Sequence, residues 1–64
     1  SDILDIEAMI KLQNVLRSKG YDVGKVDGIL GAKTRQAVRL VQLEFGLSAD
    51  SWPTKDLLSK LSMN

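Results

Sequence analysis

The sequence predicts a single compact all-α domain of three helices across residues 1–64, with a core from about residue 5 to 62. Apolar residues recur at helical spacing in three segments, near residues 5–19, 32–45 and 54–61. A glycine follows each of the first two segments, as expected where a helix ends. A glycine-containing stretch between these two segments has the composition of an ordered loop rather than of a linker.

The first predicted helix runs from about Asp5 to Lys19 and stops at Gly20. Its apolar residues share one wide arc at about 100° per residue: Ile6, Met9, Ile10, Leu12 and Leu16. Acids lie first and bases last, an order that complements the helix dipole. Gln13 lies inside the apolar arc and needs hydrogen-bond partners there. We expect it to tie the helix to the loop rather than to contact a ligand.

Residues 21–34, YDVGKVDGILGAKT, form the most distinctive stretch and hold three of the five glycines. Asp27-Gly28 supports a tight turn, because Asp accepts hydrogen bonds from nearby backbone N–H groups and Gly tolerates positive φ. Apolar residues alternate with the turn formers and can fix the loop to a core: Val23, Val26, Ile29 and Leu30. We therefore expect a specified loop shape and look here first for function.

Two ligand motifs resemble parts of this loop without fitting. With Gly28 at the sixth position of an EF-hand loop, Asp27 is the single carboxylate at the aligned ligand positions. The spacing from Gly31 to Thr34 lacks the Gly-Lys-Ser/Thr ending of a phosphate loop. Cysteine and histidine are absent, so zinc would have to use carboxylates alone. We expect no metal and no cofactor.

The second predicted helix runs from about 32 to 45 and ends at Gly46, with Thr34 in the middle of its apolar stripe. We interpret Thr34 as a buried hydroxyl bonded back to the loop, since no base accompanies it. Arg35 either belongs to a solvated face or meets a ligand. Leu40 and Leu43 lie off the stripe, where they contact another element or form a small exposed patch.

A second short connection, LSADSWPT, leads to the third predicted helix, residues 54–61. Thr54 or Ser51 can cap this helix, and Pro53 fits near its start. Trp52 is the only tryptophan. We expect it to fill the core, with a recognition platform at the edge of the domain as the alternative.

Composition excludes several classes of function. Nine Lys and Arg against eight Asp and Glu give a formal charge of +1, far from the excess that nucleic-acid binding requires, so no nucleic-acid partner is expected. No apolar run approaches the roughly 20 residues of a membrane span. No nucleophile with a histidine and no acid–base pair can be assembled, so we expect no enzyme. No leader precedes the domain, which suggests a mature domain or a module of a longer protein.

The chain contains a faint internal repeat. The first copy reads Leu12-Gln13, Gly20-Tyr21, Asp27-Gly28 and Thr34. The second copy reads Val41-Gln42, Gly46-Leu47, Asp50-Ser51 and Thr54, with shorter spacings. Two such half-units would share the middle helix.

The ordered series of these residues, with Leu16, Gly24, Val26, Gly31 and Ala37-Val38, resembles the peptidoglycan-binding domain of bacterial cell-wall hydrolases. The resemblance covers about residues 10–61. Leu30 and Val41 stand where the family usually has Phe, and both are apolar replacements. The compact second copy, from Asp50 to Thr54, looks most like the C-terminal module of membrane-bound lytic murein transglycosylases.

The resemblance implies a non-catalytic module that binds peptidoglycan, through its peptide stem, and tethers an attached catalytic domain in the bacterial periplasm, envelope or exterior. The expected groove lies between the loop and the start of the second helix. Its expected ligand-binding residues are Tyr21, Asp27, Gly28, Ile29, Leu30, Gly31 and Arg35. The alternative is a module that docks on its own catalytic domain or on a partner protein through Leu40, Leu43 and Trp52. A helix-turn-helix DNA binder is disfavoured by the near-neutral charge.

Overall fold

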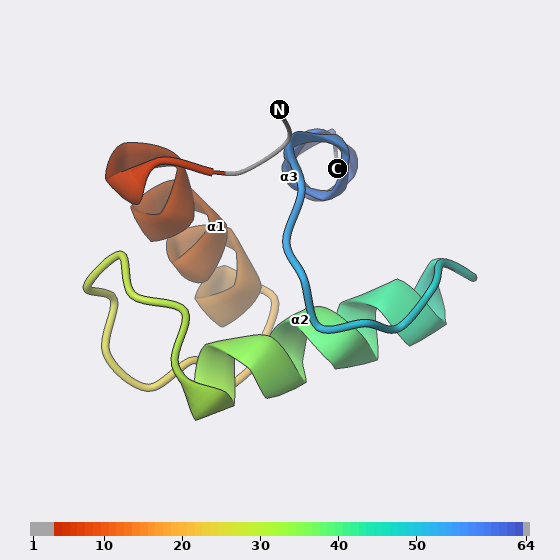
Figure 1. The fold of residues 1–64 in the computed structure, drawn as a ribbon, viewed down its shortest axis with the longest axis horizontal. Coiled ribbons are helices and arrows are strands. Elements are labelled where there is room, and N and C mark those ends of the chain that lie inside the picture. The colour runs from red at the N-terminus through yellow and green to blue at the C-terminus, as the bar shows by residue number, and fades with distance from the viewer. Residues whose placement is uncertain (1–3, 64) are drawn as a thin grey trace.

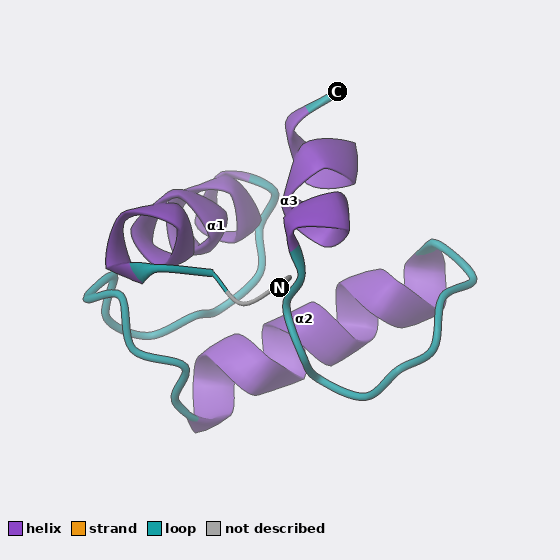
Figure 2. Cartoon of the chain, turned by 45° about the horizontal axis from the view of Figure 1, so that its top comes forward, coloured by secondary structure: helices purple, strands orange, loops and turns teal. Residues whose placement is uncertain are grey.

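The computed structural model describes residues 4–63, which form three helices and no strand. The helices are α1 (Ile6–Ser18), α2 (Ala32–Glu44) and α3 (Lys55–Ser62). Helix α1 packs against both α2 and α3, and the chain after α2 turns back along that helix before it enters α3 (Figures 1 and 2). The predicted all-α, three-helix fold is confirmed, with each predicted helix close to its observed bounds.

Side chains and glycines define the helix ends. Asp5 caps α1 by accepting a hydrogen bond from the Ala8 N–H at 2.8 Å, and Thr54 caps α3 by accepting from the Leu57 N–H at 3.1 Å. Of the two predicted caps for α3, Thr54 is therefore the one used. At the other ends, Gly20 and Gly46 adopt φ values of 94° and 72°, the left-handed conformation that closes a helix.

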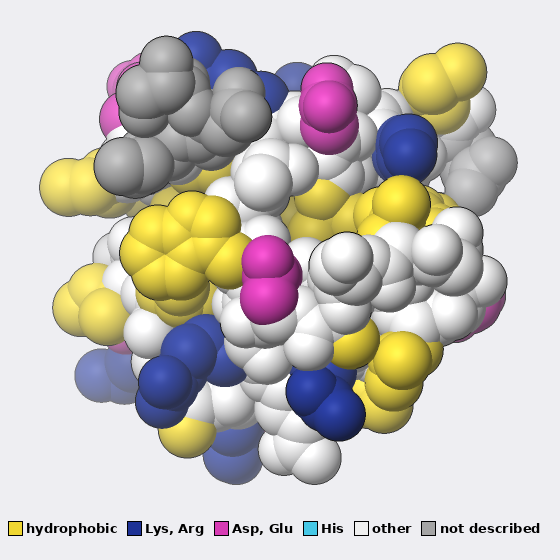
Figure 3. Space-filling view, turned by 45° about the vertical axis from the view of Figure 1, so that its right-hand side comes forward, with side chains coloured by type: hydrophobic (Ala, Val, Ile, Leu, Met, Phe, Trp, Pro, Cys, Tyr) yellow, Lys and Arg dark blue, Asp and Glu magenta, His cyan; other side chains and the backbone are white. Residues whose placement is uncertain are grey.

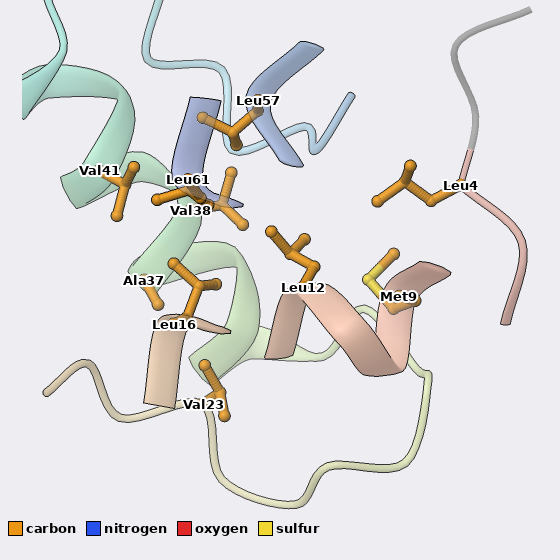
Figure 4. Close-up of a cluster of buried hydrophobic side chains, with 10 residues drawn as sticks. All are labelled: Leu4, Met9, Leu12, Leu16, Val23, Ala37, Val38, Val41, Leu57 and Leu61. Atoms are coloured by element: carbon orange, nitrogen blue, oxygen red, sulfur yellow. The ribbon is translucent and has the colours of Figure 1, made fainter. Parts of the chain in front are cut away.

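The hydrophobic core lies where the three helices meet and includes one residue of the first loop (Figure 4). Helix α1 contributes Met9, Leu12 and Leu16; α2 contributes Ala37, Val38 and Val41; α3 contributes Leu57 and Leu61. Leu4 adds to this cluster just before α1, beside Met9 in Figure 4. Val23 is buried among these side chains, and the half-buried Val26 and Leu30 pack against them, so the first loop is fixed to the core at several points.

Three predictions about burial are wrong. Ile29, predicted to help fix the first loop to the core, is 66% exposed. Trp52 does not fill the core, because half of its surface, 51%, is exposed, and Pro53 next to it is buried instead. Ile6, which the helical pattern assigns to the apolar arc, is 68% exposed because it lies in the first turn, at the edge of the helix contact. The arc read from sequence is thus wider than the face that the domain buries.

Leu40 and Leu43 take the second of their two predicted alternatives and are exposed on α2. On the face drawn in Figure 3, hydrophobic side chains reach the surface in separate places with charged and polar groups between them. Within residues 4–63, each helix is too short or too polar to cross a bilayer.

Candidate functional site

Gln13 organises the first loop. Its Oε1 accepts hydrogen bonds from the N–H groups of Asp27 and Gly28, at 3.1 and 2.8 Å. Its Nε2 donates to the Ile29 carbonyl at 3.0 Å and to the Thr34 hydroxyl oxygen at 3.1 Å. The side chain is fully buried, so all its hydrogen bonds are made within the protein. The prediction that a buried amide ties the helix to the loop is confirmed.

Two further side chains fix the same loop. The Thr34 hydroxyl donates to the Val23 carbonyl at 3.2 Å, which confirms the buried hydroxyl bonded back to the loop. Asp27 Oδ1 accepts from the Ile29 N–H at 2.9 Å and thereby forms the expected turn. The loop between α1 and α2 is consequently held by side chains from both helices and from within itself.

Gly28 lies where this loop touches α1. Its φ of 80° is in the left-handed region, and an added Cβ would come within 2.7 Å of Ile6 Cγ2 and 3.3 Å of Ile10 Cγ1. Both the backbone conformation and the close approach require glycine at this position.

An open hollow of about 240 Å³ lies between this loop and the first turn of α2. Its lining residues are Val23, Gly24, Lys25, Asp27, Ile29, Gly31, Ala32, Lys33 and Thr34. Gly31 is the N-terminal cap residue of α2 and supplies no side-chain cap, and the start of this helix lines the hollow through Gly31, Ala32, Lys33 and Thr34. The partial positive charge of a helix N-terminus thus adds to the charge of two lysines.

An ion pair borders this hollow. Lys33 Nζ lies 3.5 Å from Asp22 Oδ2, and both side chains are largely exposed. The Gly24 N–H, 2.9 Å from Asp22 Oδ1, and then the Lys33 charge hold the pKa of Asp22 below its ordinary value. An exposed pair of this kind stabilises the fold little.

The structure brings together some of the sequence-predicted site residues. Asp27, Ile29 and Gly31 line the hollow, and Ile29 is 66% exposed. Gly28 and Leu30 lie in the same loop but are half-buried and do not line the hollow. Arg35 is exposed on α2, one helical turn beyond Gly31.

Tyr21 lies elsewhere. It lines a smaller hollow of about 60 Å³ together with Lys19, Val41, Glu44, Phe45 and Leu61. Its hydroxyl donates a hydrogen bond to Glu44 Oε2, which raises the pKa of Tyr21. The Tyr21 hydroxyl is thus engaged between the end of α1 and the end of α2 rather than at the first hollow.

Sequence reasoning missed Lys25 and Lys33 as lining residues of the first hollow. Their positions could have indicated this role, because each lysine lies in or next to the glycine-containing loop. Arg35 drew attention instead because guanidinium groups favour carboxylates, but side-chain type does not determine which way a helical residue faces.

Gln42 holds the second connection as Gln13 holds the first. Its Oε1 accepts from the Ser51 N–H at 3.0 Å, and its Nε2 donates to Asp50 Oδ1 at 3.0 Å and to the Trp52 carbonyl at 3.1 Å. Asp50 Oδ1 also accepts from the Trp52 N–H at 2.9 Å. In the same way, Asp27 Oδ1 accepts from the N–H of Ile29, the residue two positions later. The faint repeat is therefore a repeat of hydrogen bonds.

The family model described as "Putative peptidoglycan binding domain" matches residues 6–61. Spore cortex-lytic enzyme of Bacillus cereus is 42% identical over an aligned length of 57 residues, and the match covers 84% of this chain and 22% of that protein.

Two solved structures of SltB3 from Pseudomonas aeruginosa share the fold. The complex with NAG-anhNAM-pentapeptide has a TM-score of 0.84 at 50% identity, over 88% of this chain and 15% of that one. The complex with NAG-NAM-pentapeptide has a TM-score of 0.83 at 51% identity, over 86% of this chain and 15% of that one. The chain thus spans less than a quarter of the length of each of these relatives.

Proposed function

The chain belongs to the peptidoglycan-binding domain family, whose members occur in cell-wall lytic enzymes. We propose that it binds the peptide stem of peptidoglycan. Within such enzymes the domain is the accessory binding module and not the catalytic part. The SltB3 complexes contain a pentapeptide joined to sugar, which supports a ligand that includes the stem.

One observation carries the proposal: the open hollow of about 240 Å³ between the loop held by Gln13 and the first turn of α2. A stem peptide ends in a carboxylate, which suits Lys25, Lys33 and the positive end of α2. Asp27 offers a carboxylate for an amine or amide N–H of the same peptide. The exposed Ile29 supplies apolar contact, so the hollow combines the few polar groups and the apolar lining of a ligand site.

The remaining predicted residues have subordinate roles in this proposal. Gly31 allows a ligand to approach the backbone closely. Gly28 lets the loop pack against α1, and Leu30 supports the loop from its half-buried position. Arg35 extends the basic surface by one turn of α2. Tyr21 contributes apolar contact only to a ligand long enough to reach beyond the first hollow, because its hydroxyl is bonded to Glu44.

The module would act by raising local concentration. A weak binder joined to a catalytic domain keeps that domain near an insoluble polymer without performing chemistry. We propose that a longer chain supplies the catalytic domain, and that the protein works in the periplasm or elsewhere in the bacterial cell envelope.

Sedimentation of the purified domain with insoluble sacculi, at low and moderate salt, tests the proposal. We expect saturable retention by the parent and a loss of about tenfold for the double variant Lys25→Glu and Lys33→Glu. The double variant Lys55→Glu and Lys60→Glu makes the same change of charge at two exposed positions of α3 and should bind as the parent does. Equal retention of all three proteins would refute the assignment of the hollow, and no retention of the parent would refute stem binding altogether.

Two single variants address the residues outside the hollow. Arg35→Ala and Tyr21→Ala each weaken retention if the ligand extends from the hollow along α2. Retention equal to that of the parent in both variants would restrict the site to the hollow.

A second candidate is a docking surface, which the exposure of Leu40 and Leu43 favours. These side chains lie three residues apart on α2 and are 48% and 56% exposed. In this role they would contact the catalytic domain of the longer chain. Replacing both by Asp should abolish binding to that domain, supplied as a separate protein, while retention on sacculi stays unchanged. A parent domain that binds only sacculi would remove this candidate.

A further inference from the structure

Trp52 combines exposure with a fixed backbone. Half of its surface is exposed, yet its N–H donates to Asp50 Oδ1 at 2.9 Å and its carbonyl accepts from Gln42 Nε2 at 3.1 Å. Pro53 follows directly and is buried. An exposed aromatic side chain on such a restrained backbone loses little conformational freedom when it binds a ligand, which is the property of a contact residue.

Trp52 also occupies the position in the second repeat that Ile29 occupies in the first. Each residue follows a residue with positive φ, Gly28 at 80° and Ser51 at 65°. Each donates its N–H to an Asp two residues earlier and offers its carbonyl to a buried glutamine. Ile29 lines the proposed stem site, so the same construction in the second loop presents a second, aromatic contact residue.

The chemistry at Trp52 differs from that of the first hollow. The lining of that hollow includes no aromatic side chain. Trp52 instead lies in a loop with the exposed carboxylate of Asp50, and the guanidinium of Arg39 donates to the Ala49 carbonyl of that loop at 3.0 Å. A flat apolar surface with charged groups nearby suits a pyranose ring, which has apolar C–H faces and polar groups around its edge.

We propose that Trp52 is a stacking platform for a sugar ring of the peptidoglycan glycan strand, at a site separate from the stem-binding hollow. This inference rests on the proposed binding of peptidoglycan and assigns the sugar part of the ligand. The domain then contacts its polymer at two places, the stem through the first loop and the glycan through the second.

The single tryptophan makes the test direct, since all tryptophan fluorescence comes from Trp52. The parent is titrated with glycan strands from which an amidase has removed the peptides, and separately with free stem pentapeptide. We expect a saturable change in emission with the peptide-free glycan and none with the free peptide. Ile29→Ala, which retains Trp52, should keep the glycan response and lose peptide binding.

Sedimentation with peptide-free glycan adds a measurement on variants. Trp52→Ala should bind about tenfold more weakly than the parent, whereas Trp52→Phe, which keeps an aromatic face, should retain most of the affinity. Circular dichroism of both variants checks that they fold.

The two proposals fail in different ways. A parent that sediments with intact sacculi but shows no change in emission with peptide-free glycan overturns the sugar platform and leaves stem binding in place. An emission change caused by free pentapeptide alone also overturns it, because Trp52 would then belong to the stem site. A parent that does not sediment with sacculi overturns both.

Discussion

Gln13 and Gln42 hold two successive loops by the same arrangement of hydrogen bonds. Each glutamine is buried, with 0% and 5% of its surface exposed. Gln13 lies in the middle of α1, and Gln42 lies in the last turn of α2. Each Oε1 accepts from the backbone of the following loop, and each Nε2 donates to a carbonyl two residues beyond an Asp. Each loop is therefore held by the side-chain amide of a glutamine in the helix that precedes it.

Replacement of Gln13 by Leu should destabilise the domain strongly. The change leaves the N–H groups of Asp27 and Gly28 without their acceptor, and the Ile29 carbonyl and Thr34 hydroxyl without their donor. We expect a loss of about 3 kcal/mol in the free energy of unfolding, measured by urea denaturation. Gln36→Leu, at an exposed position of α2, should stay within about 0.5 kcal/mol of the parent. Similar losses in both variants would show that the hydrogen bonds of Gln13 contribute little.

Gly28→Ala should cost more stability than Gly20→Ala. Both positions have positive φ, so each substitution strains the backbone by about 1 kcal/mol. At Gly28 the new Cβ also lies 2.7 Å from Ile6 Cγ2, whereas at Gly20 no atom lies within 4 Å. We expect thermal unfolding to give about 1 kcal/mol more destabilisation at Gly28. An equal effect of the two variants would mean that Ile6 moves aside freely.

Gly31→Asp should raise stability while it lowers binding to sacculi. The carboxylate supplies the side-chain cap that α2 lacks and complements the helix dipole, for a gain of about 0.5 kcal/mol. It also places a negative charge in the hollow proposed for the stem carboxylate. Gly31→Asn supplies a cap of the same size without the charge and is the matched control, which should bind more tightly than Gly31→Asp does. Binding of Gly31→Asp at the level of the parent would argue against a carboxylate in this hollow.

Acid should destabilise the domain partly through Asp50. The Trp52 N–H and then the Gln42 amide hold the pKa of Asp50 below its ordinary value of about 4. Between the folded and the unfolded pKa the unfolded chain binds more protons, so stability falls as the pH falls through the folded pKa. The contribution is fully present above about pH 5.

Asp50→Asn isolates this effect, because its Oδ1 still accepts the hydrogen bonds but carries no charge. Urea denaturation at several pH values should give a shallower loss of stability in acid than the parent shows. The remaining slope includes Asp22, whose pKa is lowered in the same direction. Unchanged slopes would show that the Asp50 charge does not contribute.

Much of the fold follows from local sequence features. Helical spacing and the glycines after α1 and α2 predict the helices, and the position of Gln13 within an apolar arc predicts its bonds to the loop. The ordered series of motifs predicts the peptidoglycan-binding family, which the matching model over residues 6–61 confirms. These features are local in the chain or depend on a residue whose polar group requires a buried partner.

The candidate site is harder to predict. Asp27, Ile29 and Gly31 line the first hollow, but Tyr21 bonds to Glu44 and lies at another one. Tyr21 and Glu44 are distant in sequence, and no periodicity of the sequence predicts that the end of α1 lies beside the end of α2. Whether Tyr21 and Arg35 contact the ligand remains a prediction for the sedimentation variants.

The three helices, their ends and the family follow from the sequence alone, because helical spacing and caps act over a few residues and the motifs occur in a fixed order. Which members of an apolar arc are covered depends on how the helices assemble. Trp52 is a large apolar residue of the kind expected in a core, yet it is half-exposed, whereas Leu57 and Leu61 of α3 are buried among the core residues. Burial depends on the volume that neighbouring helices leave free, and that volume is a property of the assembled fold.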